Sequence, residues 1–294
     1  MPAELIDGRA IARGVRADVA ARVAKLAESG VKPGLAVVLI GDDPASAVYV
    51  RAKGKACEEA GMHSITLHLP ADTSEADLLA RVGHMNVDPA IHGILVQMPL
   101  PRQIDPGKII RGIDPSKDVD GFHPVNVGKL LAGARDGFVP CTPAGIQLML
   151  AECGVKTPGK SCVVIGRSNI VGKPMAALML QDNDRANCTV TVCHRHTVDL
   201  PAHTLRADIL IVAAGRPRTV TAGMVKPGAV VIDVGMNRVA DSAADGGTRL
   251  EGDVDFDAVR QVASKITPVP GGVGPMTIAM LLRNTVTAAE RRST

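Results

Sequence analysis

The chain has 294 residues, 46% hydrophobic and 21% charged, a balance typical of soluble globular proteins and enough for two domains of ordinary size. It has no Trp, one Tyr and three Phe, and its net charge of +3 is not gathered into basic runs, so we expect no nucleic-acid partner. Its first residues lack the apolar core of a signal peptide and no uncharged apolar run approaches ~18 residues, so we expect no membrane partner and a cytoplasmic location.

The cysteines indicate neither disulfides nor a metal centre. Six cysteines are scattered without CxxC spacing in a chain long enough to fold without cross-links, so we expect reduced thiols. Cys193, His194 and His196 are conceivable metal ligands, but no fourth ligand has a recognisable spacing. We therefore predict that the protein holds no metal.

The first half of the chain alternates between helical and strand-like patterns. Apolar residues recur at helical spacing in some segments, while short continuous apolar runs predict strands buried in a parallel sheet. Two aspartates, a glycine and a proline without a clear period predict a loop over residues 117–127. The expected elements are helices at 8–28, 46–61 and 74–85, and strands at 35–40, 65–69 and 93–96.

The second half alternates in the same way, which predicts a doubly wound, Rossmann-type parallel sheet. The segment 239–250 is rich in Asp, Ala and Gly and is expected to be an exposed excursion. The whole chain is therefore predicted to be an α/β protein. The expected elements are helices at 142–153 and 275–291, with strands at 161–165, 189–193, 208–213 and 229–234.

The turn after the strand at 161–165 predicts a phosphate site. Gly166 ends the strand and a helix is predicted from Gly172, so the backbone N–H groups at the start of that helix should face a ligand. The match to the G-x-G-x-x-G fingerprint is imperfect, because Ser168 occupies the position of the second glycine. A plain strand-to-helix turn is the alternative.

Two arginines favour NADP over NAD. NAD enzymes usually carry a carboxylate for the ribose 2′-hydroxyl at the end of the next strand, where this chain has Arg195 between two histidines. Arg195 and Arg167 offer donors for a 2′-phosphate, although the interval of about thirty residues from the turn is longer than the usual ~20. Two ordinary surface arginines are the alternative.

Two further patterns are consistent with a bound substrate. Tyr49 and Lys53 are four residues apart on a predicted helix, so a phenol and an amine share one face and can position or move a proton. A solvated lysine is the alternative. The run 270–275 holds three glycines and two prolines, which lets a flat ligand lie close to the main chain. A rigid crossover between domains is the alternative there.

Taken together, the sequence resembles the bifunctional methylenetetrahydrofolate dehydrogenase/methenyltetrahydrofolate cyclohydrolase family, over essentially the whole chain. Five motifs occur in order, which makes the resemblance highly specific. They are YVRAKGKAC at 49–57, GILVQMPLP at 93–101, KDVDGFHPVN at 117–126, GRSNIVGKP at 166–174 and PGGVGPMT at 270–277.

The resemblance implies a homodimer of chains with two α/β domains flanking a cleft. Residues 1–140, completed by the C-terminal helix 275–294, would form the folate-binding and catalytic domain, and residues 141–274 the NADP-binding domain. The implied activity is NADP-dependent oxidation of 5,10-methylenetetrahydrofolate to 5,10-methenyltetrahydrofolate, followed by hydrolysis to 10-formyltetrahydrofolate. Purine and amino-acid biosynthesis would use the product.

The resemblance also assigns roles to residues. Lys53 matches the catalytic lysine, Gln97 the residue that hydrogen-bonds it, and Tyr49 the residue that orients the folate ring. Asp120 matches the carboxylate that holds the amino edge of the pterin. Further implied folate contacts are Ser46, Val96, Met98, Pro270, Gly271, Gly272, Val273 and Gly274. Implied NADP contacts are Gly166, Arg167, Ser168, Arg195, Ile232, Gly274 and Thr277.

Two other functions remain open at this point. One is another two-domain NADP-dependent dehydrogenase, such as a shikimate dehydrogenase relative, which the KDVDGFHP context of Asp120 disfavours. The other is a non-catalytic dinucleotide sensor, which the presence of both Lys53 and Gln97 disfavours.

Overall fold

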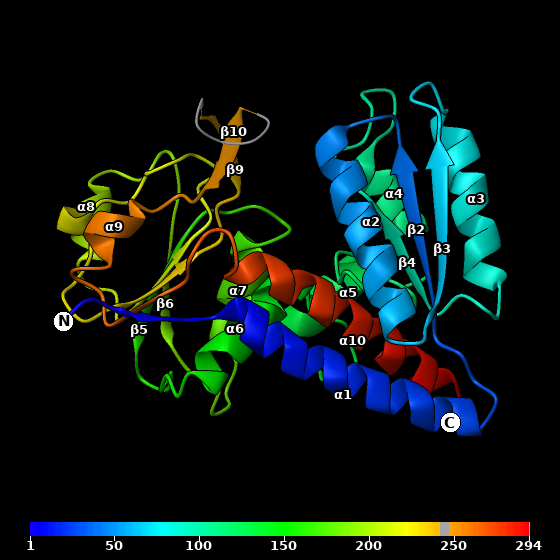
Figure 1. The fold of residues 1–294 in the computed structure, drawn as a ribbon, viewed down its shortest axis with the longest axis horizontal. Helices are drawn as coiled ribbons and strands as arrows, with labels where there is room; N and C mark the ends of the chain where they lie inside the picture. The colour runs from blue at the N-terminus through cyan, green and yellow to red at the C-terminus, as the bar shows by residue number, and fades with distance from the viewer. Residues whose placement is uncertain (242–246, 294) are drawn as a thin grey trace. The chain divides into compact units, whose positions relative to one another are not determined.

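The computed structural model describes residues 1–241 and 247–293, which form two compact units (Figure 1). One unit comprises Arg13–Cys141 with Ile278–Thr294, and the other comprises Met1–Ala12 with Thr142–Thr277. The family resemblance implies one domain over all of residues 1–140, but residues 1–12 belong to the other unit. The reason is β1 (Glu4–Leu5), which pairs in parallel with β11 (Lys265–Ile266) in the second unit.

The unit that contains residues 13–141 is built on a three-stranded parallel sheet in the order β3-β2-β4. Every residue of the central strand, β2, is buried, which explains its continuous apolar sequence, because helices cover both faces of a parallel sheet. The strands are β2 (Gly34–Ile40), β3 (His63–Leu69) and β4 (Gly93–Val96), and the helices include α2 (Pro44–Glu59), α3 (Glu75–Val87), α4 (Pro106–Gly112) and α5 (Pro124–Leu131).

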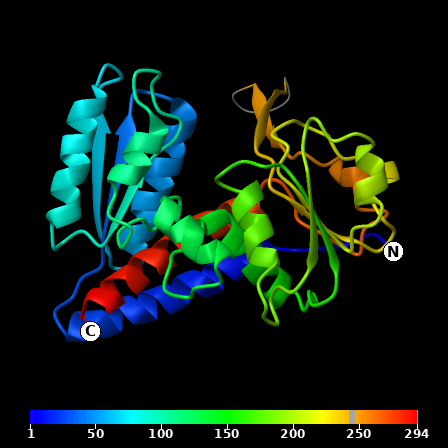
Figure 2. The ribbon, with the colours of Figure 1, turned by 180° about the vertical axis from the view of Figure 1, so that it is seen from behind.

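The helices divide between the two faces of this sheet. Alternate residues of β2, among them Ala36 and Val38, join Leu78 and Val82 of α3 and Ile109 of α4 in one buried cluster. The two views show α3 on one side of the sheet and α2 on the other (Figures 1 and 2). Because successive side chains of a strand point to opposite faces of the sheet, the other residues of β2 lie on the face that α2 covers.

One predicted loop is partly helical. The sequence predicts a loop over 117–127, but α5 begins within that range, at Pro124. His123 caps the helix, since its Nδ1 accepts a hydrogen bond of 3.1 Å from the Val125 N–H. Proline suits the first helical position because a backbone N–H there has no partner inside the helix. The prediction is therefore wrong for the last residues of the range.

The same unit contains parts of two long helices that lie side by side, α1 (Gly8–Glu28) and α10 (Val273–Ser293) (Figures 1 and 2). The Arg22 guanidinium of α1 donates hydrogen bonds of 2.9 and 2.6 Å to the Glu290 carboxylate of α10, and one of 2.8 Å to the Thr287 hydroxyl. Such a bidentate contact fixes geometry as well as distance. It ties the C-terminal helix to the first long helix within this unit.

The other unit is built on a six-stranded parallel sheet in the order β1-β11-β8-β7-β5-β6. The predicted doubly wound sheet is confirmed, because the order reverses between β5 and β7, and the switch point lies at the carboxyl ends of these two strands. The remaining strands are β5 (Ser161–Ile165), β6 (Thr189–Cys193), β7 (Ile209–Val212) and β8 (Val230–Asp233).

Short helices and a hairpin complete this unit. The hairpin pairs β9 (Asn237–Ala240) with β10 (Thr248–Glu251) where the sequence predicts an exposed excursion, and part of that segment, residues 242–246, lies outside the described residues. No helix in the described part of the chain is long and apolar enough to cross a membrane. The helices are α6 (Cys141–Glu152), α7 (Gly172–Met179), α8 (Leu200–Thr204), the 3-10 helix η1 (Ala222–Met224) and α9 (Phe256–Val259).

A buried carboxylate joins the end of β8 to the chain after β10. Asp233 is 3% exposed and accepts hydrogen bonds from the N–H groups of Gly235, Asp253 and Val254 at 2.8, 2.9 and 3.0 Å. Gly252 lies against this carboxylate, and a Cβ there would be 1.8 Å from Asp233 Oδ2. Because three backbone donors hold the carboxylate, it has little freedom to move aside.

This packing predicts that Gly252→Ala lowers the free energy of unfolding by about 1–3 kcal/mol, because the added methyl group overlaps a fixed carboxylate. Gly14→Ala is the matched control, since a Cβ at that helical position meets nothing within 4 Å. The control should stabilise the protein by about 0.5–1 kcal/mol. Urea denaturation measures both changes, and equal stability of the two variants would contradict the prediction.

Candidate active site

The helix that carries the predicted catalytic lysine begins earlier than its sequence suggests. The predicted start is residue 46, but α2 starts at Pro44 because Asp43 is the N-cap, and its carboxylate accepts a 2.8 Å hydrogen bond from the Ser46 N–H. Ser46 is buried, Tyr49 is half-buried, and Lys53 is only 8% exposed. The lysine is thus not an ordinary solvated side chain.

Lys53 is held by a glutamine at the end of the adjacent sheet. Its Nζ donates a 2.8 Å hydrogen bond to Oε1 of Gln97, which directly follows β4. The Gln97 amide is fixed from its other side, since Nε2 donates to the Met98 carbonyl at 2.7 Å, and the Gln97 backbone N–H donates to the Val38 carbonyl at 2.8 Å. These bonds turn the amide oxygen of Gln97 toward the lysine.

Asp120 lies in the same unit, on a segment that a second aspartate holds in place. Asp118 is 2% exposed, and its carboxylate accepts hydrogen bonds from the N–H groups of Phe122 and His123 and from the Asn126 side chain, at 3.2, 2.8 and 2.8 Å. Asp120 itself is half-buried, and the thiol of a buried cysteine, Cys141, donates a 3.4 Å hydrogen bond to the carbonyl of the preceding residue, Val119. These contacts fix the carboxylate that the resemblance assigns to the substrate.

Burial shifts the ionisation of this cluster. Loss of solvent lowers the pKa of Lys53, and the negative charges of Asp120 and, when ionised, Cys141 oppose that shift. Loss of solvent raises the pKa of Asp120, and this rise is opposed by the Lys53 ammonium and by the nearby Cys141 thiol. The arrangement favours a lysine that gives up its proton more readily than an exposed one.

The structure brings some of the predicted folate residues together. Lys53 and Gln97 are in contact, and Lys53 and Asp120 interact electrostatically. Val96 ends β4 and Met98 follows it, so both lie beside Gln97 in the chain. The segment 270–274 belongs to the other compact unit, where the Gly271 carbonyl accepts a 3.2 Å hydrogen bond from the Arg9 N–H.

The predicted cofactor turn lines a cavity of about 580 Å³ at the switch point of the six-stranded sheet. The lining includes four of the predicted NADP residues, Gly166, Arg167, Ser168 and Arg195. Its volume lies within the usual range for small-molecule sites. The cavity therefore has the position and the size that a dinucleotide site requires.

The serine at the second glycine position stabilises the turn. Its hydroxyl, Ser168 Oγ, accepts hydrogen bonds from the N–H groups of Val171 and Gly172 at 3.2 and 3.4 Å. The prediction that the first N–H groups of the next helix are free for a ligand is therefore wrong for these two. Gly172 is needed for close packing, because a Cβ there would be 2.2 Å from the Gly166 carbonyl oxygen.

The other predicted cofactor residues are not part of the cavity lining. Ile232 is fully buried in β8, and Gly274 and Thr277 lie in the first turns of α10. The cavity adds Arg216, which the sequence analysis missed, in the segment after β7. Arg216 could have been predicted from the sequence, because β7 is the strand next to β5 at the switch point, and residues that follow such a strand face the ligand.

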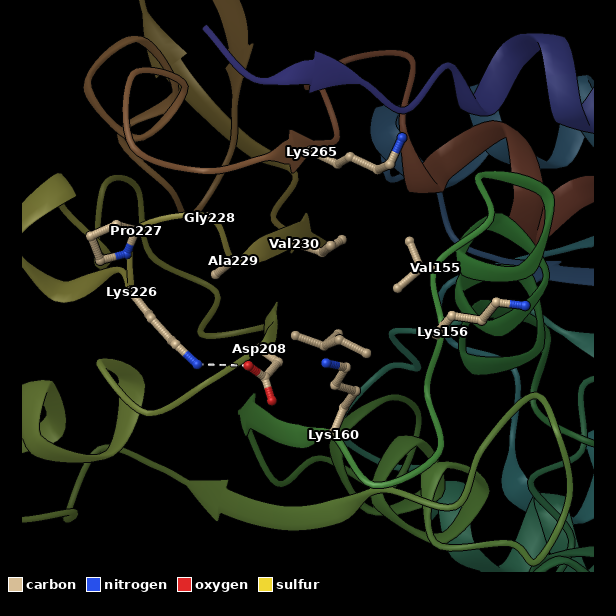
Figure 3. Close-up of a pocket in the computed structure, with 11 residues that line it drawn as sticks. Val155, Lys156, Lys160, Asp208, Lys226, Pro227, Gly228, Ala229, Val230 and Lys265 are labelled. Atoms are coloured by element: carbon tan, nitrogen blue, oxygen red, sulfur yellow. Dashed lines mark hydrogen bonds and ion pairs between the residues drawn. The ribbon is translucent and has the colours of Figure 1, made fainter. Parts of the chain in front are cut away.

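A second cavity, of about 430 Å³, lies in the same unit at the opposite, amino ends of the strands, near the first residues of β7, β8 and β11 (Figure 3). Two of its lysines have carboxylate partners. Lys226 donates a 2.7 Å hydrogen bond to Asp208, and Lys265 is paired with Glu4. None of the predicted site residues lines it, and no group of three or more His, Cys, Asp or Glu in the described residues could hold a metal.

Comparison with known sequences identifies the family. Residues 6–120 match a family model described as the tetrahydrofolate dehydrogenase/cyclohydrolase catalytic domain, and residues 140–293 match the NAD(P)-binding domain of the same family. The chain belongs to the tetrahydrofolate dehydrogenase/cyclohydrolase family. The resemblance drawn from the five motifs is confirmed.

Individual relatives match this chain over nearly their full length. The bifunctional protein FolD of Paracidovorax citrulli is 61% identical, with 99% of each chain covered. The crystal structure of the bifunctional FolD enzyme from Campylobacter jejuni has a TM-score of 0.93 at 47% identity, covering 98% of this chain and 99% of that one. The FolD of Trypanosoma brucei, solved with NADP and an inhibitor, has a TM-score of 0.94 at 41% identity, covering 100% and 99%.

The burial of Asp118 predicts a pH-dependent contribution to stability. Desolvation raises its pKa to about 6, above the ~3.9 of an unfolded chain, so the folded protein binds this proton more tightly. Its contribution to stability is therefore greatest at low pH and is lost as the pH rises through about 6. The unfolding free energy of the unmutated protein should increase relative to that of Asp118→Asn as the pH falls from about 7.5 to 5.

Asp136→Asn is the control for this measurement. The Asp136 carboxylate is exposed and pairs with Lys129, whose hydrogen bond lowers its pKa, so it does not titrate in this pH window. Its difference from the unmutated protein should stay constant in urea denaturation across the range. A constant difference for Asp118→Asn as well would show that Asp118 does not titrate near pH 6.

Proposed function

We propose that this chain is a bifunctional enzyme of folate one-carbon metabolism in which Lys53 accepts the proton that leaves the attacking water during hydrolysis. It oxidises 5,10-methylenetetrahydrofolate to 5,10-methenyltetrahydrofolate with NADP, then hydrolyses the product to 10-formyltetrahydrofolate. The observation that carries the assignment of the lysine is its burial together with its 2.8 Å hydrogen bond to Gln97. A buried amine with a lowered pKa, held by a neutral partner, is suited to general acid–base work.

The first step requires positioning more than proton transfer. NADP supplies a nicotinamide that accepts a hydride. The chain has to hold the folate methylene carbon in a fixed orientation toward it, and the nitrogen lone pair of the folate can assist hydride loss. Asp120 is suited to this task, because a carboxylate can accept two hydrogen bonds from the adjacent N–H groups on the amino edge of a pterin. Tyr49 would orient the ring.

The second step requires a base. Hydrolysis adds water to the methenyl carbon, and a proton has to leave the attacking water. The bond between this carbon and one of the two folate nitrogens then breaks, that nitrogen takes up a proton, and the carbon stays on the other nitrogen as the formyl group. Neutral Lys53 can accept the proton from the water, and Gln97 can hold the lysine nitrogen before and after transfer because its amide oxygen accepts from either form of the amine. The nearby Asp120 carboxylate compensates the ammonium charge that forms.

The assignment of NADP rests on the charge of the cavity at the cofactor turn. Arg167, Arg195 and Arg216 contribute to its lining, which contains no carboxylate among the described residues. Arginine forks match the geometry of a phosphate group, and a 2′-phosphate distinguishes NADP from NAD. Ser168 and the 166–172 turn would hold the pyrophosphate. Ile232, Gly274 and Thr277 would complete the contacts.

The remaining assignments follow the resemblance. Ser46, Val96, Met98 and the segment 270–274 would line the folate. The unit containing residues 13–141 and 278–294 would hold the folate, and the other unit NADP. The enzyme would act in the cytoplasm as a homodimer and supply one-carbon units for purine and amino-acid biosynthesis. A catalytically silent dinucleotide sensor would instead turn over neither substrate in a spectrophotometric assay.

The cofactor assignment predicts that kcat/KM with NADP exceeds that with NAD by a large factor. Arg195→Asp should lower kcat/KM for NADP by about one to two decades, because a charge-assisted contact to phosphate is worth about 1.5–3 kcal/mol. Arg206→Asp, an exposed arginine outside the cavity lining, is the control and should leave the ratio unchanged. Equal use of both cofactors by the unmutated protein would contradict the assignment.

The role of Lys53 predicts that the two activities separate in one variant. Lys53→Met keeps the apolar stem and removes the proton carrier, so cyclohydrolase activity should fall by roughly 10² to 10⁴. Dehydrogenase activity should fall less, so methenyltetrahydrofolate accumulates and is measured by its near-ultraviolet absorbance. In the unmutated enzyme, cyclohydrolase activity should fall as the pH decreases and Lys53 becomes protonated.

Lys55→Met is the matched control, since Lys55 lies on the same helix but is exposed, with a 3.8 Å contact to Glu59. Such a surface pair contributes little, and both activities should remain. Unchanged hydration of methenyltetrahydrofolate by Lys53→Met would falsify the role of this lysine and leave Tyr49 or a bound water as the proton carrier.

A further inference from the structure

The loop that follows β7 carries part of the lining of the cofactor cavity. Arg216 and Thr219 of this loop line the cavity, and the Thr219 hydroxyl donates a 2.9 Å hydrogen bond to the Arg216 carbonyl. Gly215, directly before the arginine, has a φ of 70°. Glycine adopts this left-handed conformation without strain but can adopt many others, so the loop needs contacts that select one. These contacts come from the segment after β10, residues 251–255.

Asp253 holds the loop at its glycine. The aspartate is fully buried, and its Oδ2 accepts a 2.8 Å hydrogen bond from the Gly215 N–H. The other carboxylate oxygen, Oδ1, accepts a 2.8 Å hydrogen bond from Nδ2 of Asn237 on β9. A buried carboxylate is costly unless its oxygens receive hydrogen bonds, so it does not readily give up either donor. The carboxylate therefore fixes the peptide group on the N-terminal side of Gly215.

The same segment also holds the far side of the loop. The Arg218 N–H donates a 3.4 Å hydrogen bond to the Gly252 carbonyl, and the Arg218 guanidinium pairs with the Glu251 carboxylate. Glu251 does not line the cofactor cavity. The two arginines of the loop thus have different surroundings, because Arg216 lines a cavity without a carboxylate among its described lining residues.

We propose that Asp253 is a positioning residue for the cofactor, whose hydrogen bond to Gly215 sets the conformation in which the loop presents Arg216 to a phosphate group of NADP. This inference rests on the proposed function, which assigns NADP to this cavity. Neither Asp253 nor Asn237 lines the cavity, so both act through the loop. An arginine fork binds phosphate through two parallel hydrogen bonds, and its affinity therefore depends on the direction in which the loop presents it.

The first measurement establishes the contact made by Arg216. Calorimetric titration of the full-length protein gives the dissociation constants of NADP and NAD. Arg216→Gln should raise the dissociation constant of NADP about tenfold, since a charge-assisted contact is lost. An equal rise for NAD assigns Arg216 to the pyrophosphate, and a rise for NADP alone assigns it to the 2′-phosphate. Either result supports the proposal, and an unchanged dissociation constant for NADP overturns it.

Asp253→Asn tests the positioning role at nearly constant volume. An asparagine has a single amide oxygen, so it cannot accept from both the Gly215 N–H and the Asn237 amide. The dissociation constant of NADP should rise about three- to tenfold, with KM for methylenetetrahydrofolate unchanged at saturating NADP. Combined with Arg216→Gln, it should cause no further rise, because the loop then has no charged side chain to position.

A purely structural role of Asp253 would give a different pattern. The effects of Asp253→Asn and Arg216→Gln would then multiply in the double variant, or Asp253→Asn would lower only the free energy of unfolding in urea. Either result overturns the proposal. Asp255→Asn is the matched control, because Asp255 lies on the same segment and its side chain accepts no hydrogen bond from α9, the helix that it precedes. It should leave the dissociation constant of NADP unchanged.

Asn237→Leu tests the same link if Asp253→Asn does not give folded protein. It removes the donor to Oδ1 and leaves the Asp253 carboxylate in place. We expect a two- to threefold rise in the dissociation constant of NADP, about the effect of a weakened hydrogen bond, and no rise in the Arg216→Gln background. Equal effects of Asn237→Leu in both backgrounds would overturn the proposal.

Arg195→Asp separates a failure of this inference from a failure of the proposed function. If it weakens NADP binding while Arg216→Gln and Asp253→Asn do not, the cofactor site stands and only the role of Asp253 is rejected. If the unmutated protein binds neither NADP nor NAD, the proposed function fails, and this inference fails with it.

Discussion

The burial of the Lys53 amine is the constraint on which the candidate active site depends. An exposed lysine is almost fully protonated near neutral pH and cannot accept a proton, so a lysine base must lose solvent. Removing solvent from an ammonium is costly unless its hydrogen bonds are satisfied, and Gln97 supplies a neutral acceptor at 2.8 Å. A carboxylate in the place of Gln97 would satisfy the bond too, but it would raise the pKa of the lysine and keep the amine protonated near neutral pH, so that it could not accept a proton.

The same balance explains the position of Asp120. A fully charged carboxylate in direct contact would cancel the effect of burial on Lys53, whereas a distant one would not compensate the charge that forms during hydration. Burial of Asp120 raises its own pKa, and Cys141 partly reverses that shift. The neighbouring Asp118 holds the segment through three hydrogen bonds. The electrostatics of the site thus depend on groups that need not touch the substrate.

Much of the fold and of the candidate site could be predicted from the sequence, and the predictions that were wrong or missing have physical causes. The strands at 93–96 and 161–165 have the predicted bounds, because a strand buried on both faces is a continuous apolar run between glycines or polar residues. The strand at 189–193 also has the predicted bounds, although it is a partly exposed edge strand, because its alternating Thr and Val residues are typical of strands. The two-residue strands β1 and β11 are too short to show any period. The Lys53–Gln97 contact followed from the family motifs, whereas no sequence pattern indicated that Cys141 lies near Asp120, since the fold brings together two separate segments of the chain there.

The two candidate sites also differ in what builds them. At the cofactor turn the main chain decides the geometry, because Gly166 has a φ of 126° and a Cβ at Gly172 would be 2.2 Å from the Gly166 carbonyl oxygen. The turn tolerates the loss of the usual second glycine because the Ser168 hydroxyl bonds the turn in which it lies. At the lysine, side chains decide the geometry. A sequence fingerprint therefore finds the cofactor turn through its glycines, while the proton carrier is distinguished from a surface lysine only by the burial and hydrogen bonding that the fold provides.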